Sequence, residues 1–567
     1  MAIKSMIAAL LLGSGAAPFA AAGASGVTVD MTMAAPDHLM VSYFLPAGCG
    51  KLPFDKHGGD GAAIRAQWQA LDQCGSADGE ALLRKDNACA AVRLRVPAST
   101  ASRPGYPAAF PLGETLYVHT SNFAVGPQCG PVTYRFHAPK EVALQGRIVP
   151  GSAEVKDGGD MGVLLSSVPL TAAPEGIRYY APGLGASNVE RIDRVARGTV
   201  AYLKSAMPDA PFRMPVLAAA RVEAPGGVGV DGDAADVLRL GLLNWPAQPS
   251  HDDQEQLTLL VSHEFSHRFQ LRDAFDDYAD GRLIHEGGAE FLRWVVGVQN
   301  GWLSKQEAAR VLDDALAECL LATGRRTWRA LDKREIGSRR LAYRCGLPAY
   351  AYALAARQGG DTALQRFSGL YRSAQAGHMP NFAQALECGT HAACQARWLP
   401  ALLEKEVPMR QAFGALFDAT TLAHVAAPTA SQRKLMLLQA FEWLMHEDCG
   451  GASYFPGTNV IIVDGSVQCR ALKGGMRVSQ VEGYALSDPD AVQALSSACA
   501  QRKQVRLGLE QGQPVDVACS KPYDATQRFY HADIDALLAA LKLPPAPKEL
   551  VSDPEASALP LASSAAR

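Results

Sequence analysis

The sequence lacks a charge excess of either sign. Its 567 residues include 54 Lys and Arg against 57 Asp and Glu, which gives a formal net charge of −3. A chain this close to neutral has neither the basic footprint of a nucleic-acid-binding protein nor the polybasic surface that binds anionic membranes. We therefore expect no nucleic-acid partner.

Long hydrophobic runs are missing beyond the N-terminus. The chain opens with MAIKSMIAALLLGSGAAPFAAAGASG, in which a lysine precedes an apolar run and small residues follow it. This order is typical of a secretory signal peptide, and the run is shorter than the ~20 residues of a membrane span. An uncleaved anchor is the alternative interpretation. We predict a signal peptide over residues 1–24, export to the periplasm or beyond the cell, and no stable membrane insertion after cleavage.

Several signatures of catalysis and metal binding are also absent. The chain has no G-x-S-x-G elbow, no P-loop, no Rossmann fingerprint and no C-x-x-C pair. Its 12 cysteines are therefore interpreted as disulfides of an exported protein rather than as a catalytic thiol or a cysteine-rich zinc site. Sequence cannot fix the connectivity, but close sequential pairs are available: Cys319 with Cys345, Cys388 with Cys394, Cys449 with Cys469, and Cys499 with Cys519.

What the chain does contain is organised in blocks. VTVDMTM and HLMVSYFLP near the N-terminus alternate in the manner of strands. FRMPVLAAARVE and DVLRLGLLNW are further strand candidates, and residues 254–425 are mostly helical in pattern. A new unit begins near residues 425–440, and in its latter part, residues 472–519, the pattern gives strand, turn, helix, strand, turn, strand. The last residues are rich in Pro, Ala and Ser and predict disorder.

One helical segment, QLTLLVSHEFSHRFQL, carries the first chemical motif. Helical spacing puts His263 and His267 one turn apart on one face, where two imidazole nitrogens reach a single zinc ion. Glu264 lies beside the first histidine and can reach a water molecule next to the metal without binding the metal itself. An H-E-x-x-H motif also arises by chance on solvated helices. A third ligand is therefore needed to distinguish a zinc site from two ordinary surface histidines.

That third ligand is expected in LIHEGGAEFLRWVVG. Eighteen residues separate His267 from Glu286, which lies on a second predicted helix. The tandem Gly287-Gly288 is costly inside a helix unless something approaches closely, such as the metal helix or a substrate. Glu290, one turn beyond Glu286, can accept a hydrogen bond from the far nitrogen of a ligand histidine, although a plain surface carboxylate is the alternative.

These two motifs resemble those of the gluzincin zinc metallopeptidases, most closely the aminopeptidase-N-type and glycyl-aminopeptidase-type families. The resemblance is carried by H-E-x-x-H and by His285-Glu286-Gly287-Gly288-Ala289-Glu290-Phe291, compared with a common N-E-G-F-A-E/T-Y. The ligand glutamate and its glycine match, whereas His285 and Gly288 replace the asparagine and the phenylalanine.

The resemblance also implies a tyrosine that donates to the oxyanion of the reaction. In YRCGLPAYAYALAARQGGDTALQRFSGLY, Tyr343 and Gly346 fit the family's Y-x-x-G pattern. Tyr350 and Tyr352 stay open as alternative donors. The family's G-x-M-E-N strand, whose glutamate binds a substrate's free amine, has its nearest match in LGLLNW, where Leu243 stands in place of the glutamate. Aminopeptidase and endopeptidase activity therefore both stay open.

We accordingly expect a multidomain α+β protein. Its parts are a signal peptide over 1–24, an N-terminal β domain over 25–170, a thermolysin-like, mainly helical zinc catalytic domain over 171–425, a PDZ-like α+β domain over 426–543, and a disordered tail over 544–567. The PDZ likeness lacks a carboxylate-binding glycine loop.

The expected function is that of an exported, disulfide-bonded zinc metallopeptidase acting on peptides or proteins. His263, His267 and Glu286 would bind zinc, Glu264 would act as general base, Tyr343 would stabilise the oxyanion, and Glu290 would support a ligand histidine. A catalytically inactive, peptide- or protein-binding member of the same scaffold is the alternative. The sequence does not determine the oligomeric state.

Overall fold

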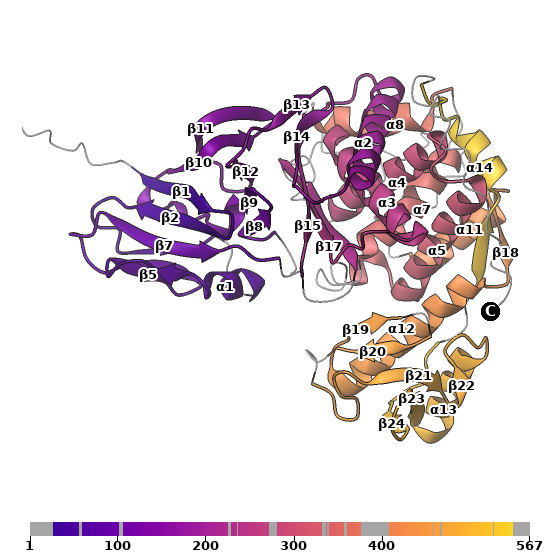
Figure 1. The fold of residues 1–567 in the computed structure, drawn as a ribbon. Coiled ribbons are helices and arrows are strands. Elements are labelled where there is room, and N and C mark those ends of the chain that lie inside the picture. The colour runs from indigo at the N-terminus through magenta and orange to yellow at the C-terminus, as the bar shows by residue number, and fades with distance from the viewer. Residues whose placement is uncertain are drawn as a thin grey trace, which may run out of the picture. The chain divides into compact units, whose positions relative to one another are not determined.

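The structure is a computed structural model. It describes residues 26–55, 59–100, 106–224, 228–234, 236–270, 281–331, 336, 340–356, 360–375, 407–457, 459–464, 468–524 and 527–547. The chain divides into two compact units, the first Met1–Leu184 with Pro215–Pro246, the second Gly185–Met214 with Ala247–Arg567 (Figure 1). The first is rich in strands and the second in helices, which confirms a multidomain α+β protein with a β-rich N-terminal part.

The first unit is built on a nine-stranded sheet in the order β4-β7-β2-β1-β10-β12-β9-β8, with β11 paired to β10. Alternate side chains of β1 are buried, and this alternation made the strand visible in the sequence. The strands are β1 (Val27–Ala35), β2 (His38–Phe44), β4 (Gln69–Ala70), β7 (Ala91–Pro97), β8 (Ala109–Leu112), β9 (Thr115–His119), β10 (Val132–Leu144), β11 (Arg147–Lys156) and β12 (Gly162–Ser166). A three-stranded sheet and a short helix accompany them: β3 (Lys51–Pro53), β5 (Gly75–Ala77), β6 (Ala81–Arg84) and α1 (Gly59–Arg65).

A second sheet of the first unit has the order β13-β14-β15-β17-β16. Its strands are β13 (Thr171–Ala173), β14 (Gly176–Tyr180), β15 (Val216–Val222), β16 (Gly229–Ala234) and β17 (Val237–Leu243). The central strands β14, β15 and β17 are parallel and most of their residues are buried, as is usual for parallel strands. The two strands predicted in this region are confirmed as β15 and β17.

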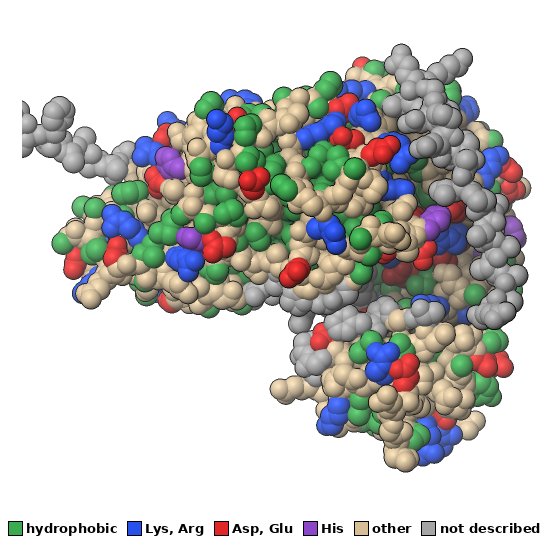
Figure 2. Space-filling model, viewed as in Figure 1, with side chains coloured by type: hydrophobic (Ala, Val, Ile, Leu, Met, Phe, Trp, Pro, Cys, Tyr) green, Lys and Arg blue, Asp and Glu red, His purple; other side chains and the backbone are tan. Residues whose placement is uncertain are grey.

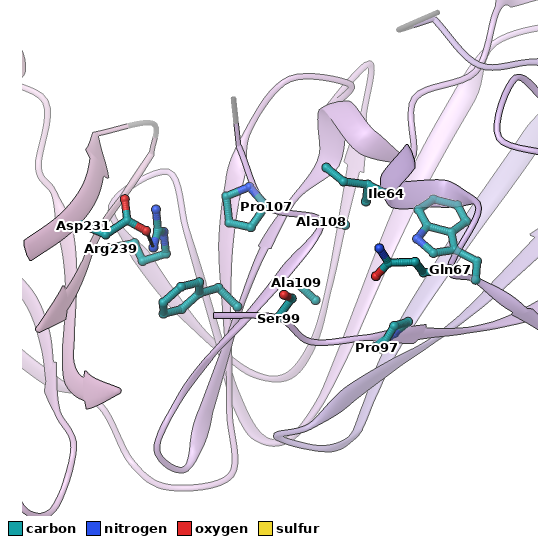
Figure 3. Close-up of a pocket in the computed structure, with 11 residues that line it drawn as sticks. Ile64, Gln67, Pro97, Ser99, Pro107, Ala108, Ala109, Asp231 and Arg239 are labelled. Atoms are coloured by element: carbon teal, nitrogen blue, oxygen red, sulfur yellow. Dashed lines mark hydrogen bonds and ion pairs between the residues drawn. The ribbon is translucent and has the colours of Figure 1, made fainter. Parts of the chain in front are cut away.

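A cavity of about 50 Å³ lies within the first unit. Arg239 and Asp231 form an ion pair at 2.8 Å on one side of it, and Ile64 and Gln67 lie on the other (Figure 3). The Arg239 guanidinium also lies 4.3 Å from the ring centroid of Phe110. This buried charge is thus compensated by a carboxylate and by an aromatic face.

The helices of the second unit pack side by side, with α3 against α2 and α4, and α4 against α7 (Figure 1). They are α2 (Ala186–Ala206), α3 (His251–Ser266), the 3-10 turn η3 (His267–Phe269), α4 (Gly281–Gln299), α5 (Lys305–Thr323), η5 (Trp328–Ala330), α7 (Leu341–Ala356), α8 (Ala363–Gln375) and α11 (Met409–Asp418).

The C-terminal part of this unit has a core of its own around α12 (Ala430–Cys449) and α13 (Ala491–Arg502). Its antiparallel sheet has the order β19-β20-β21-β23-β24, with β22 paired to β21. The strands are β19 (Tyr454–Pro456), β20 (Ile461–Val463), β21 (Arg477–Val481), β22 (Tyr484–Ala485), β23 (Gln504–Leu509) and β24 (Val515–Ala518). The predicted strand, turn, helix, strand, turn, strand order is present.

The chain then returns to the helices. β18 (Ala423–Ala426), before this C-terminal part, pairs with β25 (Phe529–Ala532), after it, and α14 (Ile534–Leu541) packs against α5 and α7. The face shown in Figure 2 has acidic and basic side chains interspersed with apolar and uncharged ones.

Five disulfides join cysteines of the described residues: Cys49–Cys129, Cys74–Cys89, Cys319–Cys345, Cys449–Cys469 and Cys499–Cys519. Three of the four predicted pairs are confirmed, and the pair Cys388–Cys394 lies outside the described residues. The two N-terminal disulfides were not predicted. In the part of the chain that the structure describes, no helix has both the length and the apolar character of a membrane span.

Asp313 of α5 is a buried carboxyl that faces β25. One of its oxygens accepts a hydrogen bond from the backbone N–H of Ala532 at 2.8 Å. Burial raises the pKa of Asp313 to about 7, helped by the nearby charge of Asp314 and opposed by the Ala532 hydrogen bond.

We expect Asp313→Asn to stabilise the protein more at pH 8 than at pH 5. An aspartate of the unfolded chain titrates near pH 4. Because the folded pKa is raised, the stabilisation that Asp313 provides below about pH 4 is lost as the pH rises through about 7. Asparagine still accepts from Ala532 and never ionises. Thermal unfolding at both pH values checks this, with the exposed Asp418→Asn as control, and an equal effect at both pH values would contradict it.

Candidate metal centre

Helix α3 is fixed at its start by a capping box. Ser250 Oγ accepts from the N–H of Asp253 at 3.1 Å, and the Asp253 carboxylate accepts from the N–H of Ser250 at 2.9 Å. The buried residues Leu257, Val261 and Phe265 then hold one face of the helix in the core. These contacts set the direction in which the histidines of the last turn project.

His263 and His267 converge at the end of α3. The helix proper ends at Ser266, but the N–H of His267 still bonds to the carbonyl of His263, so the one-turn spacing is kept. The Nε2 atoms of the two rings lie 3.1 Å apart, and both side chains are buried. The geometry expected from the spacing is thus present.

Glu286 reaches the same point from α4. Its Oε2 lies 3.5 Å from Nε2 of His263 and 3.4 Å from Nε2 of His267. Zinc in a tetrahedral site has ligands about 2.1 Å away, so neighbouring ligand atoms are about 3.4 Å apart. The three donor atoms have this spacing, and a nitrogen, nitrogen, oxygen donor set is one that zinc accepts. The residues therefore fit a zinc ion.

The electrostatics of these donors suit a cation. Burial opposes charge on Glu286, but both histidines bond to it and hold its pKa well below the usual value. Burial likewise lowers the pKa of His263, yet Glu286 and Glu290 outweigh this effect and raise it to about 9. Two carboxylates thus create a buried negative potential at the point where the imidazole nitrogens meet.

Glu290 lies behind His263. Its Oε1 is 2.8 Å from Nδ1 of His263, close enough for a hydrogen bond, although the N–H does not point directly at the oxygen. The other carboxylate oxygen pairs with Arg293, one turn further along α4. Against the effect of burial, Arg293 and His263 lower the pKa of Glu290 to about 2.

Of the three candidate tyrosines, only Tyr343 lies at this site. Its ring stacks on His263 with centroids 5.5 Å apart, and burial together with the nearby Glu286 carboxylate raises the pKa of its hydroxyl. Tyr350 instead donates to the backbone carbonyl of Ile284 at 3.1 Å. Tyr352 is buried between Phe413 and Phe417. The structure thus brings together His263, Glu286 and Tyr343 from three separate helices.

Glu264 is buried one residue after His263. Its charge helps to raise the pKa of both His263 and Tyr343, which shows that the carboxylate field reaches both groups. For Tyr343, burial is the larger cause, followed by Glu286, and the phenol stays protonated over the whole physiological range. The Arg340 guanidinium lies 4.4 Å from the centroid of the Tyr343 ring.

The tandem glycines permit two close approaches. A Cβ on Gly287 would lie 2.6 Å from Cα of Gly346 in α7, and a Cβ on Gly346 would lie 2.2 Å from Cα of Gly287. A Cβ on Gly288 would lie 2.6 Å from the Gln270 amide and 3.1 Å from the Tyr371 hydroxyl. The expectation of a close approach is confirmed, but the partners are α7 and a side-chain network.

Sequence reasoning missed four side chains around the centre. Gln270 bonds to His267, His285 stacks on the His267 ring at 4.4 Å, Arg293 pairs with Glu290, and Arg340 covers Tyr343. Only Arg293 had a sequence signal, because a position three residues after Glu290 lies on the same helix face.

Leu243 ends strand β17 in the first unit. The next residue, Asn244, has a positive φ of 46°, and its amide bonds to both backbone polar groups of Ala224, donating to the carbonyl at 2.9 Å and accepting from the N–H at 3.1 Å. This asparagine thus closes a local turn.

Comparison with known proteins identifies solved structures with a similar fold. No family model matches the chain, and no curated protein does. Among solved structures, an aminopeptidase N family protein from Idiomarina loihiensis aligns with 91% of this chain and 100% of its own, at 12% identity and a TM-score of 0.57. An M1 zinc metallopeptidase mutant from Deinococcus radiodurans is 14% identical and aligns with 68% of this chain and 95% of its own, at a TM-score of 0.40. Yeast LTA4 hydrolase is 10% identical and aligns with 74% of this chain and 72% of its own, at a TM-score of 0.38.

The chain therefore has the fold of an aminopeptidase N family protein, with a nitrogen and carboxylate donor cluster in its helical unit. That resemblance was expected from the two motifs. At this identity the comparison concerns the fold alone.

We expect Gly346→Ala to lower both the thermal unfolding midpoint and the zinc affinity. The new methyl group would force α4 and α7 apart beside Glu286, and overpacking of this kind costs about 1–3 kcal/mol. Gly369→Ala in α8 is the matched control, since the nearest atom to its added Cβ is the end of an arginine at 3.9 Å. Unfolding scans and chelator competition measure the two effects. Wild-type values for both in Gly346→Ala would show that the helices tolerate the extra volume.

Proposed function

We propose that the chain is a zinc-dependent metallopeptidase whose metal is held by His263, His267 and Glu286. The observation that supports this most directly is the convergence of three buried donor atoms at 3.1–3.5 Å, the spacing of tetrahedral zinc ligands. When bound, zinc lowers the pKa of an adjacent water toward ~7 and polarises the scissile carbonyl.

Glu264 is proposed as the general base. It directly follows a ligand histidine, is buried, and its charge acts on both His263 and Tyr343, which supports a carboxylate close to the metal position that is not one of the three donors. In this role it takes the proton of the attacking water and passes it to the leaving amine.

Tyr343 is proposed as the oxyanion donor. Burial and the neighbouring carboxylates keep its hydroxyl protonated, so it can donate a hydrogen bond. Its ring stacks on His263 and lies against the Arg340 guanidinium, with the Glu286 carboxylate nearby. A donor fixed in this way needs little reorganisation when charge develops on the substrate.

Glu290 is proposed to orient His263. A carboxylate behind a ligand imidazole fixes its tautomer and increases its basicity. Because Arg293 neutralises the other oxygen, this carboxylate stays ionised although it is buried.

We further propose that the protein is exported, periplasmic or secreted, after removal of residues 1–24. Five disulfides are consistent with an extracellular protein. We also propose an N-terminal β domain over 25–170, a catalytic domain over 171–425, a PDZ-like domain over 426–543 and a disordered tail over 544–567. The substrates of the enzyme would be peptides or proteins.

The alternative is an inactive zincin scaffold that binds peptides or proteins. A purely structural zinc site has no need of a buried carboxylate at Glu264, which favours the enzyme. Peptides with free and with blocked N-termini would then separate aminopeptidase from endopeptidase activity. In the sequence match Leu243 stands in place of the amine-binding glutamate, so an amine anchor is in question. Equal cleavage of free and blocked peptides would exclude such an anchor.

Glu264→Gln should retain zinc and lose peptide hydrolysis. The amide preserves size but cannot take a proton, and general-base catalysis contributes about 10²–10⁴-fold. Metal analysis and cleavage of a peptide library, with and without chelator, provide the readout. Glu255→Gln, a partly buried carboxylate earlier on the same helix that pairs with Arg310, is the control. A wild-type protein that binds no zinc would end the catalytic hypothesis.

Tyr343→Phe should reduce kcat by about 10²–10³-fold, the usual loss for one oxyanion donor, with zinc content unchanged. Tyr352→Phe is a closely matched control, because its hydroxyl is buried and has no hydrogen-bond partner among the residues that the structure describes. Equal activity of the two variants would remove Tyr343 from the mechanism.

A further inference from the structure

The side chain of Gln270 lies behind His267 and is completely buried. It comes directly after η3, three residues beyond the histidine. Its Oε1 is 2.7 Å from Nδ1 of His267. Its Nε2 is 3.0 Å from the backbone carbonyl of His285 and 2.8 Å from the hydroxyl of Tyr371.

The carbonyl of His285 determines which way the Gln270 amide faces. A carbonyl oxygen only accepts hydrogen bonds, so the group that faces it must be the NH₂ of the amide. Oε1 of Gln270 is then the atom that faces His267. This orientation follows from the partners and needs no choice between the two amide atoms.

The orientation of the amide in turn determines the tautomer of His267. Because Oε1 of Gln270 only accepts, Nδ1 of His267 must carry the proton, and in a neutral imidazole the lone pair is then on Nε2. Nε2 is the atom that lies 3.1 Å from Nε2 of His263 and 3.4 Å from Glu286. The lone pair thus faces the other donors.

Gly288 makes the room for this network. A Cβ at this position would lie 2.6 Å from Nε2 of Gln270 and 3.1 Å from the Tyr371 hydroxyl, so any larger residue would displace the amide. The second glycine of the tandem is therefore explained by Gln270, as the first is explained by Gly346.

We propose that Gln270 is a positioning residue that fixes the tautomer and the direction of His267 for metal binding. The inference rests on the proposed function, since it presupposes a zinc ion at the site. His263 is backed by the carboxylate of Glu290, whereas His267 is backed by a neutral amide. Partners of this kind typically account for 10–100-fold in metal affinity.

The test compares the zinc affinity of the full chain with that of Gln270→Met, which keeps the length of the side chain and removes both polar atoms. Competition with a chromophoric chelator should show zinc binding about 10–100-fold weaker in the variant. With Co²⁺ in place of zinc, the visible absorption bands should shift, because they report ligand geometry. Gln254→Met, near the start of α3, is the matched control and should retain the wild-type affinity and spectrum.

The outcomes separate this inference from the proposed function. If the wild type binds no zinc, the proposed function fails. If the wild type binds zinc and Gln270→Met has the same affinity and cobalt spectrum, only the role of Gln270 is overturned. Should Gln270→Met not fold, as judged by thermal unfolding of the metal-free protein, Gly288→Ala takes its place, because the methyl group displaces the amide. Unchanged zinc affinity in folded Gly288→Ala would then overturn the inference.

Discussion

The backbone contact between Gly287 and Gly346 is the constraint on which the candidate centre depends. Helices α4 and α7 approach so closely there that neither position has room for a methyl group. Glu286 directly precedes one glycine, and Tyr343 lies about one turn before the other. Their side chains therefore meet beside His263, from helices that are distant in sequence. The Cys319–Cys345 disulfide, adjacent to Gly346, ties α7 to α5 at the same level.

This contact also explains how buried charges can be tolerated. Ionised carboxylates in a core are costly unless each has a partner. Glu290 has Arg293, and Glu286 has two histidines. The pairing of Glu286 with the histidines requires α3 and α4 to keep their spacing, so a small displacement of one helix would leave these groups uncompensated. Packing and electrostatics at the centre are therefore coupled.

The local parts of the centre could be predicted from sequence, and the parts made by long-range packing could not. His263 and His267 are related by one helical turn, and Glu286 and Glu290 by another, so periodicity alone places each pair on one face. Tyr343, Tyr350 and Tyr352 lie on one helix and could not be separated by pattern. Only the packing of α7 against α4 decides which ring meets His263. The strands were visible through alternation and buried runs, whereas both N-terminal disulfides join cysteines whose pairing depends on the sheet.

Gln270 illustrates the same limit and indicates why an amide suits this place. Its partners are His267, the carbonyl of His285 and the hydroxyl of Tyr371, which lies 101 residues away. A carboxylate here would face the His285 carbonyl oxygen, and none of these three partners is an arginine. A carboxylate at position 270 would thus add a second buried charge behind the histidines, without the compensation that Arg293 gives Glu290. An amide supplies the acceptor that His267 needs and a donor for the carbonyl, with no net charge. Glu290 and Gln270 can therefore each hold one histidine in a single orientation. Of these two groups only Glu290 carries a charge, and Arg293 compensates it.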